Sequence, residues 1–385
     1  MSMRFRWLAS VVMAVSICFW MGCGGSSTAG TTSMYVATQG SAQIFGYRSN
    51  INSGNLSSIN GSPFTAGAGA TSIVIDPTHA FAFVANTGTS DISRFSISAN
   101  GTLVAMSPNQ ALVGTPGGMT MDSSGKFLFV TLPQNNQISI FAVSSGNLSE
   151  VPNSPFSSDA FNIQAPIAVA VSPKSNFLYV ANQVALNQVN GSISIFSFDP
   201  TSGVLPVLNP ATPNIAAAAF PPVQAGTTPS AIAISPGGSF VYVTNSGTNN
   251  LDGFAVDTGA TNPTNVGDLV PIVGTPFPAG LHPVAAAIDP SGQFLYVVNQ
   301  NSNTVTGYKI AHTDGKLTTL ANSPFNTGAG PVAIGISPTN KFLYVSNNSA
   351  NTISTFSIDP PSGNIGPTSA TVSTGAQPAG IAFGR

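Results

Sequence analysis

The segment Phe294-Leu-Tyr-Val-Val-Asn299 is a short apolar run that ends in an amide, as expected for a buried β-strand. Close copies stand at residues 177–182, 240–245 and 342–347. An aromatic residue ends such a run seven times, between 46 and 63 residues apart, and in six copies another aromatic follows twelve positions later. This regular spacing indicates that one supersecondary unit has been copied along the chain.

The copy around residue 294 shows the content of one unit. Residues 284–288 are apolar without alternation, which is typical of a strand buried on both faces. Asp289-Pro290-Ser291-Gly292 supplies a turn. Residues 294–298 and 304–310 are the second and third strands, and a weak fourth strand begins at residue 316. Four strands per unit predict the blade of a β-propeller.

The order of strands recurs in six complete copies, and the two ends of the chain supply a seventh. Residues 378–383 read as a first strand with nothing after it, and residues 34–40 as a second strand with nothing before it. We therefore predict an all-β fold, a seven-bladed β-propeller of four-stranded blades over residues 34–385. Blade 1 is split between 34–64 and 378–385, and pairing of the N- and C-terminal strands closes the ring and removes exposed sheet edges.

The first residues read as a targeting segment. Arg4 and Arg6 precede an apolar run over residues 7–20, and Gly22-Cys23 resembles the cleavage site of bacterial lipoproteins. We expect residues 1–22 to be a lipoprotein-type signal peptide, Cys23 to be lipidated, and 23–33 to be a flexible tether. The protein is then extracytoplasmic and lipid-anchored in the cell envelope. The alternative is an ordinary secreted protein in which Cys23 is a free thiol.

Composition limits the partners. The chain has 10 Lys and Arg against 12 Asp and Glu, and loss of Arg4 and Arg6 leaves 8 − 12 = −4. Such a surface does not attract nucleic acid or anionic lipid headgroups, so we expect membrane contact only through the lipid anchor. We also expect the protein to be a monomer. No His, Cys and Asp cluster has metal-ligand spacing and no cofactor motif is present, so we predict neither metal nor cofactor.

The strands carry a family resemblance. Phe177-Leu-Tyr-Val-Ala-Asn182 and its copies resemble the repeat of the YVTN propellers. The segment from Gly280-Leu-His-Pro-Val284 to Phe294-Leu-Tyr-Val297, together with Ser323-Pro-Phe325, resembles the lactonase-type propellers, which include the 6-phosphogluconolactonases. The resemblance covers residues 34–385 and implies a propeller fold with lactone hydrolysis as one activity. Its motifs build blades, so they are specific for the fold and weakly so for activity.

Lactone hydrolysis needs a general base near an attacking water. In a propeller, ligands usually bind where the turns between second and third strands meet the loops that connect one blade to the next, here called the mouth face. His282 is the one candidate base in such a loop. Lactonase-like members often have a second histidine two positions on, where this chain has Val284. The alternative is that His282 only fixes the loop before Pro283.

Other polar residues near the mouth could bind a ligand. The expected ligand-binding set is Asn86, Asn182, Asn245, Asn299, Asn347, Asp91 and Arg94. The amides end second strands and could form neutral hydrogen bonds to a glycan or peptide, or could stabilise turns. Asp91 and Arg94 could contact a ligand or form a surface pair. Extra residues near 184–188 and 206–229 enlarge blade 4.

Two functions follow. The scarcity of Glu, His and Arg favours an envelope-anchored binding or scaffold module for a protein or glycan ligand. The alternative is a lactonase-like hydrolase that opens a small sugar lactone of the 6-phosphogluconolactonase type with His282.

Overall fold

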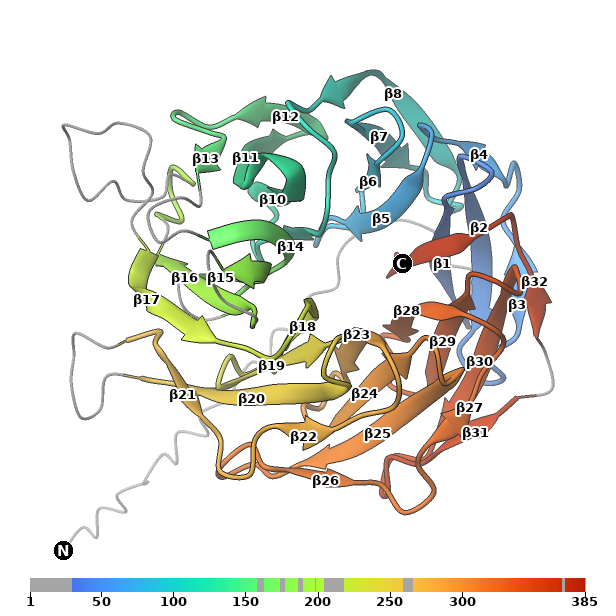
Figure 1. Ribbon diagram of the computed structural model, residues 1–385. Helices are drawn as coiled ribbons and strands as arrows, with labels where there is room; N and C mark the ends of the chain where they lie inside the picture. The colour runs from blue at the N-terminus through green and yellow to red at the C-terminus, as the bar shows by residue number, and fades with distance from the viewer. Residues whose placement is uncertain are drawn as a thin grey trace, which may run out of the picture.

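The computed structural model describes residues 30–157, 163–173, 177–185, 190–197, 199–203, 218–258, 266–368 and 371–384. Seven antiparallel sheets stand around a central axis (Figure 1). The prediction of an all-β, seven-bladed propeller is confirmed. Among the described residues one short 3-10 helix, η1 (Pro133–Asn135), interrupts the strands.

Each blade runs from an innermost strand at the axis to an outer strand at the rim. The innermost strands of blades 1 to 7 are β33 (Pro378–Phe383), β5 (Ala70–Ile75), β9 (Met119–Met121), β14 (Ile163–Val171), β18 (Pro229–Ile234), β23 (Pro283–Ile288) and β28 (Pro331–Ile336). The second strands are β1 (Thr31–Thr38), β6 (Phe81–Asn86), β10 (Phe127–Leu132), β15 (Phe177–Ala185), β19 (Phe240–Asn245), β24 (Phe294–Asn299) and β29 (Phe342–Asn347). The third strands are β2 (Gln43–Asn50), β7 (Asp91–Ile97), β11 (Gln137–Ser144), β16 (Ser192–Ser197), β20 (Asn250–Val256), β25 (Thr304–Ile310) and β30 (Thr352–Ile358).

The outer strand is continuous in two blades and split into two short pieces in the other five. It is continuous as β8 (Leu103–Ala111) and β17 (Ala218–Gln224). The split pairs are β3 (Leu56–Ser58) with β4 (Phe64–Thr65), β12 (Asn147–Glu150) with β13 (Phe156–Ser157), β21 (Leu269–Pro271) with β22 (Phe277–Pro278), β26 (Leu317–Thr319) with β27 (Phe325–Asn326), and β31 (Ile365–Pro367) with β32 (Val372–Ser373).

A serine fills the gap of a split outer strand. In blade 6, the Gly307 N–H of β25 donates to Ser323 Oγ at 3.0 Å, between β26 and β27. Ser62, Ser154 and Thr275 accept the equivalent bond in blades 1, 3 and 5. The Ser-Pro-Phe segment noted in the sequence therefore satisfies a backbone donor that the interrupted strand leaves without a partner.

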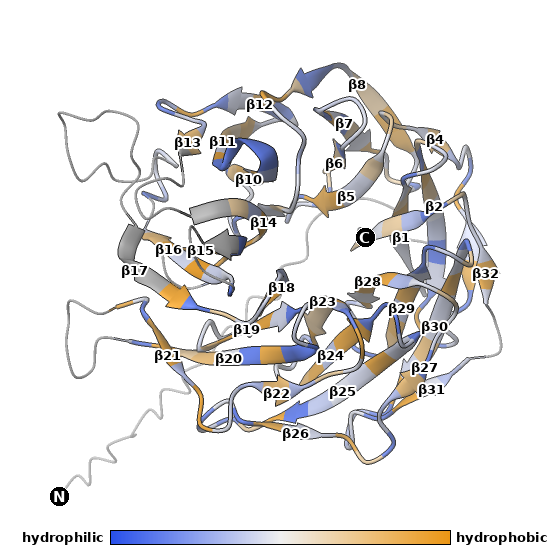
Figure 2. Ribbon diagram, in the orientation of Figure 1, coloured by the Kyte–Doolittle hydropathy of each residue, from blue (hydrophilic) through white to orange (hydrophobic). Residues whose placement is uncertain are grey.

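The second strands lack polar alternation because both of their faces are buried. In β24, Phe294, Tyr296 and Val298 pack toward blade 7, whereas Leu295 and Val297 pack toward blade 5. Successive side chains of a strand point to opposite faces, so a strand between two neighbours must be apolar at every position. Seven apolar clusters, one between each pair of adjacent blades, form the core, and hydrophobic residues accordingly occur in strands all around the ring (Figure 2).

The tyrosine of the repeated motif joins one blade to the next. Tyr296 of β24 donates its hydroxyl to the Gly363 carbonyl of blade 7 at 2.7 Å. Tyr35, Tyr179, Tyr242 and Tyr344 make the same bond to glycines of the following blades. Burial raises the pKa of these phenols, to about 12 for Tyr344, so they remain hydrogen-bond donors at neutral pH.

The ring closes through its two ends, as predicted. Met34, Tyr35 and Val36 of β1 pair with Phe383, Ala382 and Ile381 of β33. Figure 1 shows the C-terminal strand beside β1. The interface between blades 7 and 1 is also apolar, with Met34 and Val36 packed against the cluster around Tyr344.

Two boundaries differ from those expected. Strand β1 begins at Thr31, inside the segment expected to be a tether, because Thr31 and Thr32 pair with Asn50 and Ser49. Part of the expected excursion over 206–229 is the outer strand β17, which pairs with β16. The expected signal peptide, residues 1–22, and Cys23 lie outside the described residues. Within the described part, no helix has the length and apolar character to cross a membrane.

Candidate functional site

His282 lies on the mouth face, in the loop directly before β23. Its side chain is half-buried, and its backbone is left-handed with φ 56°. The His282 N–H donates to Asn249 Oδ1 at 2.7 Å, and its carbonyl accepts the Gln300 N–H at 3.0 Å. Turns of blades 5 and 6 thus hold the backbone from both sides.

This loop conformation does not require a histidine. In three other blade connections the backbone N–H of the equivalent residue donates to Oδ1 of an asparagine with positive φ. These bonds run from Ala165 to Asn136, from Gly330 to Asn303 and from Gln377 to Asn351. Ala165 and Gly330 hold the equivalent backbone without an imidazole. A role in fixing the loop before Pro283 therefore explains the backbone conformation of His282 but does not use its imidazole, which is available for another role.

The five asparagines lie beneath the mouth loops, and none has exposed surface. Asn299 Nδ2 donates to Thr304 Oγ1 at 3.1 Å and to Thr306 Oγ1 at 2.8 Å, and Asn299 Oδ1 accepts the Gly280 N–H. The loop passes so closely that a Cβ added to Gly280 would lie 2.7 Å from Asn299 Cγ. The ligand-facing position expected for these amides is therefore corrected to a buried one, shared by Asn86, Asn182, Asn245, Asn299 and Asn347.

Asp91 and Arg94 bond to different partners. Asp91, at the start of β7, accepts hydrogen bonds from the side-chain amides of Asn86 at 2.6 Å and Asn109 at 3.2 Å. Arg94 is 8% exposed, and its guanidinium donates to Asn147 Oδ1 at 2.9 Å and to the Pro108 carbonyl. The expected contact between Arg94 and a ligand at the mouth is wrong, because this side chain is enclosed between the outer parts of blades 2 and 3.

Asp252 was missed in the sequence. It is the third residue of β20, where blades 2, 6 and 7 have Ser93, Thr306 and Ser354. Its Oδ2 accepts the Gly226 N–H of the mouth loop at 2.8 Å and Asn245 Nδ2 at 2.9 Å. Burial raises the pKa of the Asp252 carboxyl, and these two hydrogen bonds oppose the rise. A carboxylate at a position of repeated hydroxyls was the available signal.

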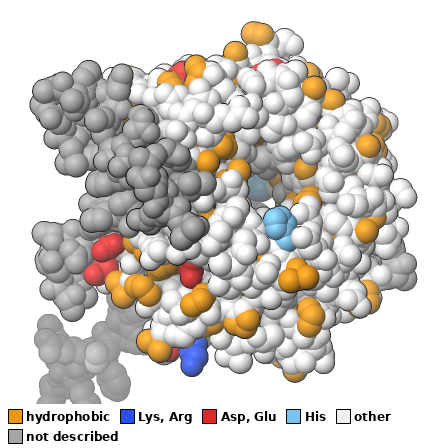
Figure 3. Space-filling view, viewed as in Figure 1, with side chains coloured by type: hydrophobic (Ala, Val, Ile, Leu, Met, Phe, Trp, Pro, Cys, Tyr) orange, Lys and Arg blue, Asp and Glu red, His pale blue; other side chains and the backbone are white. Residues whose placement is uncertain are grey.

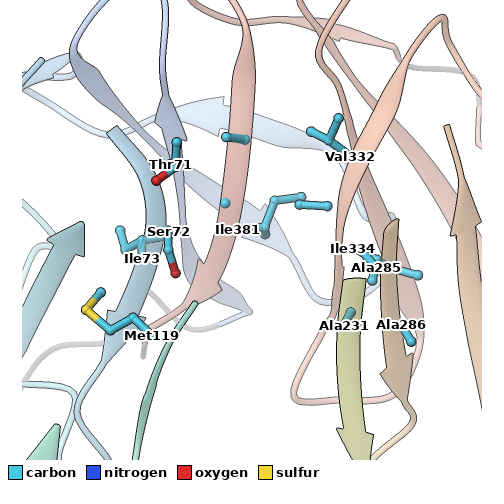
Figure 4. Close-up of a pocket in the computed structure, with 13 residues that line it drawn as sticks. Thr71, Ser72, Ile73, Met119, Ala231, Ala285, Ala286, Val332, Ile334 and Ile381 are labelled. Carbon is cyan, nitrogen blue, oxygen red and sulfur yellow. The ribbon is translucent and has the colours of Figure 1, made fainter. Parts of the chain in front are cut away.

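A cavity of about 420 Å³ occupies the axis, lined by the innermost strands. Its wall is made of alanines and larger aliphatic or methionine side chains, with Thr71, Ser72 and Gly380 as the exceptions (Figure 4). Ile73, Met119 and Ile381, which line this space, come from three different blades. The cavity is of the size that small-molecule sites have, about 300–1,000 Å³.

Five of the six basic side chains of the described residues lie on the face opposite the mouth, and the sixth, Arg94, is buried between blades 2 and 3. Lys126 and Lys341 are in turns between first and second strands, Lys316 is in a turn between third and fourth strands, and Arg48 and Lys309 stand near the ends of third strands. All five positions belong to the opposite face. On the face drawn in Figure 3, uncharged side chains ring the central opening, with a histidine at its edge.

The described residues contain no group of three or more His, Cys, Asp or Glu side chains that could hold a metal ion. Asp76, Asp122 and Asp289 instead accept backbone N–H bonds of the turns that follow the innermost strands. These carboxylates stabilise turns.

A family model described as "Lactonase, 7-bladed beta-propeller" matches residues 29–164, 213–328 and 321–385. The chain belongs to this family. Among curated proteins, a 6-phosphogluconolactonase of Formosa agariphila is 40% identical over 86 residues, which are 22% of this chain and 23% of that protein. The match therefore spans about a quarter of that relative.

Solved structures show the same fold at low identity. A Bacteroides uniformis protein that bears a provisional 6-phosphogluconolactonase name has a TM-score of 0.74 at 17% identity, covering 92% of this chain and 99% of that one. The periplasmic gluconolactonase PpgL of Pseudomonas aeruginosa has a TM-score of 0.74 at 20% identity, with the same coverage. At these identities the solved structures show that this chain shares their fold, and they do not show a shared activity.

The family match corrects the functional expectation. A binding or scaffold module was the first prediction, drawn from the scarcity of Glu, His and Arg. Membership of the lactonase family overturns that prediction and supports the alternative, lactone hydrolysis. The scarcity of charge describes the surface of this lactonase-family propeller and does not argue against an enzyme.

Proposed function

We propose that this lactonase-family propeller is a lactone hydrolase and that His282 at the mouth is its general base. The observation that carries the proposal is the family match over most of the chain, combined with a half-buried histidine in the mouth loop directly before β23, a strand that lines the axial cavity. The names of the relatives make glucono-δ-lactone and 6-phosphoglucono-δ-lactone the first substrates to assay.

In the proposed reaction, water attacks the lactone carbonyl carbon while His282 accepts a proton from that water. The ring C–O bond then breaks, and the proton passes to the departing alkoxide. One water and one lactone give one hydroxy acid, which ionises in neutral solution. A positioned base of this kind contributes about 10²–10⁴-fold to the rate.

The other histidines of the described residues lie elsewhere. His79 is in the turn between β5 and β6, and His312 is in the turn between β25 and β26. Both turns belong to the face opposite the mouth. His79 also has a left-handed backbone, with φ 57°, which makes it a matched control for His282.

The test is the rate of lactone opening by the mature protein, followed by acid release at constant pH. Asparagine tolerates positive φ, so His282→Asn removes the base and keeps the backbone. We expect kcat to fall about 10²–10⁴-fold in His282→Asn and to stay unchanged in His79→Asn. A wild-type rate equal to spontaneous opening would refute the hydrolase, and an unchanged rate in His282→Asn would refute the role of His282.

We also propose that the protein is anchored in the cell envelope through a lipidated Cys23, after removal of a signal peptide over residues 1–22. Arg4, Arg6 and the apolar run before Gly22 support this proposal. Expression with a labelled fatty acid in a bacterial host should give a labelled protein in the membrane fraction. Cys23→Ser should abolish the label, and a labelled Cys23→Ser protein would contradict the proposal.

A further inference from the structure

We infer that the substrate is an uncharged lactone with an aliphatic substituent, and that the axial cavity holds the aliphatic part. This inference rests on the proposed hydrolase function and concerns its substrate class. It stands on three observations: the chemistry of the cavity wall, the apolar residues exposed at the mouth, and the distribution of charge over the two faces.

Most side chains of the cavity wall are apolar, and the backbone of the innermost strands supplies the polar part of the wall. Ile73, Met119, Val332, Ile334 and Ile381 supply its larger side chains, and alanines supply most of the remainder. Of the two hydroxyls, Thr71 Oγ1 already donates to the Ala85 carbonyl at 3.4 Å. An alkyl chain in this space would gain apolar contact with these side chains at every methylene.

Two large apolar side chains are exposed in mouth loops. Leu281, next to His282, is 57% exposed, and Val113 in the loop between β8 and β9 is 60% exposed. Large apolar side chains at such exposure gain from covering by a ligand with a hydrocarbon part.

The mouth disfavours a phosphorylated substrate. A phosphate group requires Arg or Lys partners, and the five surface cations described above lie on the opposite face. Asp91 stands at the mouth end of β7, and Asp252 lies under the mouth loop of blade 5. Residues 186–189 and 204–217, outside the described part, contain neither Lys nor Arg in the sequence.

The proposed base and the cavity are joined by one strand. His282 precedes Pro283, the first residue of β23, and Ala285 and Ala286 of the same strand line the cavity. Three residues of extended chain span roughly 10 Å. A lactone ring beside His282 can therefore direct a substituent of several carbons down the axis.

The experiment compares kcat/KM for three kinds of lactone with the full-length protein. They are γ-lactones with alkyl substituents of one to seven carbons, glucono-δ-lactone, and 6-phosphoglucono-δ-lactone. We expect kcat/KM to rise about three- to fourfold with each added methylene until the cavity is filled. We expect both sugar lactones to be opened more slowly than the longer alkyl lactones, the phosphorylated one slowest.

Variants locate the effect. Val332, half-buried at the mouth end of β28, is changed to Thr, which has the same shape, and to Lys. Val332→Thr should reduce the gain per methylene, and Val332→Lys should abolish it and raise the relative rate on the phosphorylated lactone. Val273→Lys adds the same charge at an outer position that is 83% exposed. It should change neither the gain in kcat/KM per methylene nor the relative rate on the phosphorylated lactone. Thermal unfolding of each variant verifies folding, and Val332→Thr keeps the test valid where Val332→Lys fails to fold.

The outcomes separate the inference from the proposed function. Faster opening of either sugar lactone than of every alkyl lactone, or rates independent of chain length, would overturn the inference and leave a lactone hydrolase. No opening of any lactone above the spontaneous rate would overturn the proposed function and the inference together. A chain-length dependence that Val332→Thr weakens and Val273→Lys preserves supports the inference.

Discussion

At the scale of single residues, Asp252 is the clearest departure from the repeat. Its carboxylate accepts the same two kinds of hydrogen bond that Ser354 Oγ accepts in blade 7, from a mouth-loop N–H and from the asparagine that ends the second strand. A hydroxyl satisfies these donors without burying a charge. The carboxylate therefore lowers stability in the pH range where it is ionised in both states.

We predict that Asp252→Ser raises the free energy of unfolding at pH 7. The folded-state pKa of Asp252 is raised above the ordinary value of about 3.9. The folded protein consequently binds the proton more tightly, and stability falls as pH rises from the ordinary pKa through the raised one. The gain from Asp252→Ser should be complete above the raised pKa and vanish below about pH 3.9.

Thermal unfolding across pH 3 to 8 measures this difference. The reciprocal variant Ser354→Asp is the control and should show the opposite sign with the same pH dependence. A less stable Asp252→Ser protein at pH 7 would show that the two hydrogen bonds outweigh the burial of the carboxylate.

Single residues were also where prediction from sequence failed most. The repeat located Asn299 and its equivalents at the ends of second strands, but the approach of Gly280 that buries them depends on a neighbouring loop. Arg94 was expected at the mouth because β7 starts there, yet its long side chain reaches Asn147 of blade 3. Such contacts between distant segments leave no local pattern. Asp252 could have been found by aligning the copies.

At the scale of elements, the repeated Phe-x-Tyr motif connects neighbouring blades. Phe294 packs on the turn at Gly363, which has φ 71°, and the Tyr296 hydroxyl bonds to the carbonyl of that glycine. A side chain at Gly363 would collide with the Phe294 ring, and glycine also accepts the left-handed backbone. The two aromatic residues and the glycine form one inter-blade contact.

We predict that Tyr296→Phe lowers the free energy of unfolding by about 1–3 kcal/mol, because the Gly363 carbonyl loses its buried donor. Phe83 and Phe129 occupy the equivalent position in blades 2 and 3, so the ring itself tolerates Phe in this place. Chemical denaturation of wild type and variant at equal protein concentration measures the difference. An unchanged free energy of unfolding would mean that the hydroxyl bond contributes no net stability.

Elements were predictable wherever both faces of a strand are buried. Apolar runs such as the one within residues 294–299 predicted the second strands, because burial of both faces requires apolar side chains at successive positions. The sequence pattern of the outer strands was weaker, since one side of each outer strand contacts solvent and its sequence is less constrained. In blade 4 a composition rich in proline and alanine suggested a loop, but part of it, Ala218–Gln224, pairs as β17.

At the scale of the whole molecule, stability depends on closure. Removal of residues 374–385 takes the innermost strand from blade 1 and leaves the edge of β1 and the interface with blade 7 open. We predict loss of the single cooperative unfolding transition and aggregation, because the unpaired edge and exposed apolar surface associate with other chains.

Size-exclusion chromatography and calorimetry of the truncated protein test this, with a peptide of residues 374–385 added in excess as the control. The peptide should restore part of the monomer. A truncated protein that stays monomeric and unfolds at the wild-type temperature would contradict the importance of closure.

The ring was predictable as a whole because seven copies of one pattern, with both ends incomplete, allow few other arrangements. The function was not, because the repeat encodes blades, and the position of His282 holds Ala165, Gly330 or Gln377 in other blades. Family membership favours the hydrolase over the scaffold, and the lining of the axial cavity comes from innermost strands of several blades, which meet only after folding.

The central claim is that lactones bind at the mouth, with the ring at His282 and a substituent in the axial cavity. A crystal structure of the protein with an alkyl-substituted lactam, in which N–H replaces the ring oxygen and resists hydrolysis, tests this most directly. The account predicts the lactam carbonyl at the mouth within reach of His282 through a water, and the alkyl chain beside Val332 and Ile381. A lactam bound on the opposite face, or an alkyl chain directed into solvent, would contradict it.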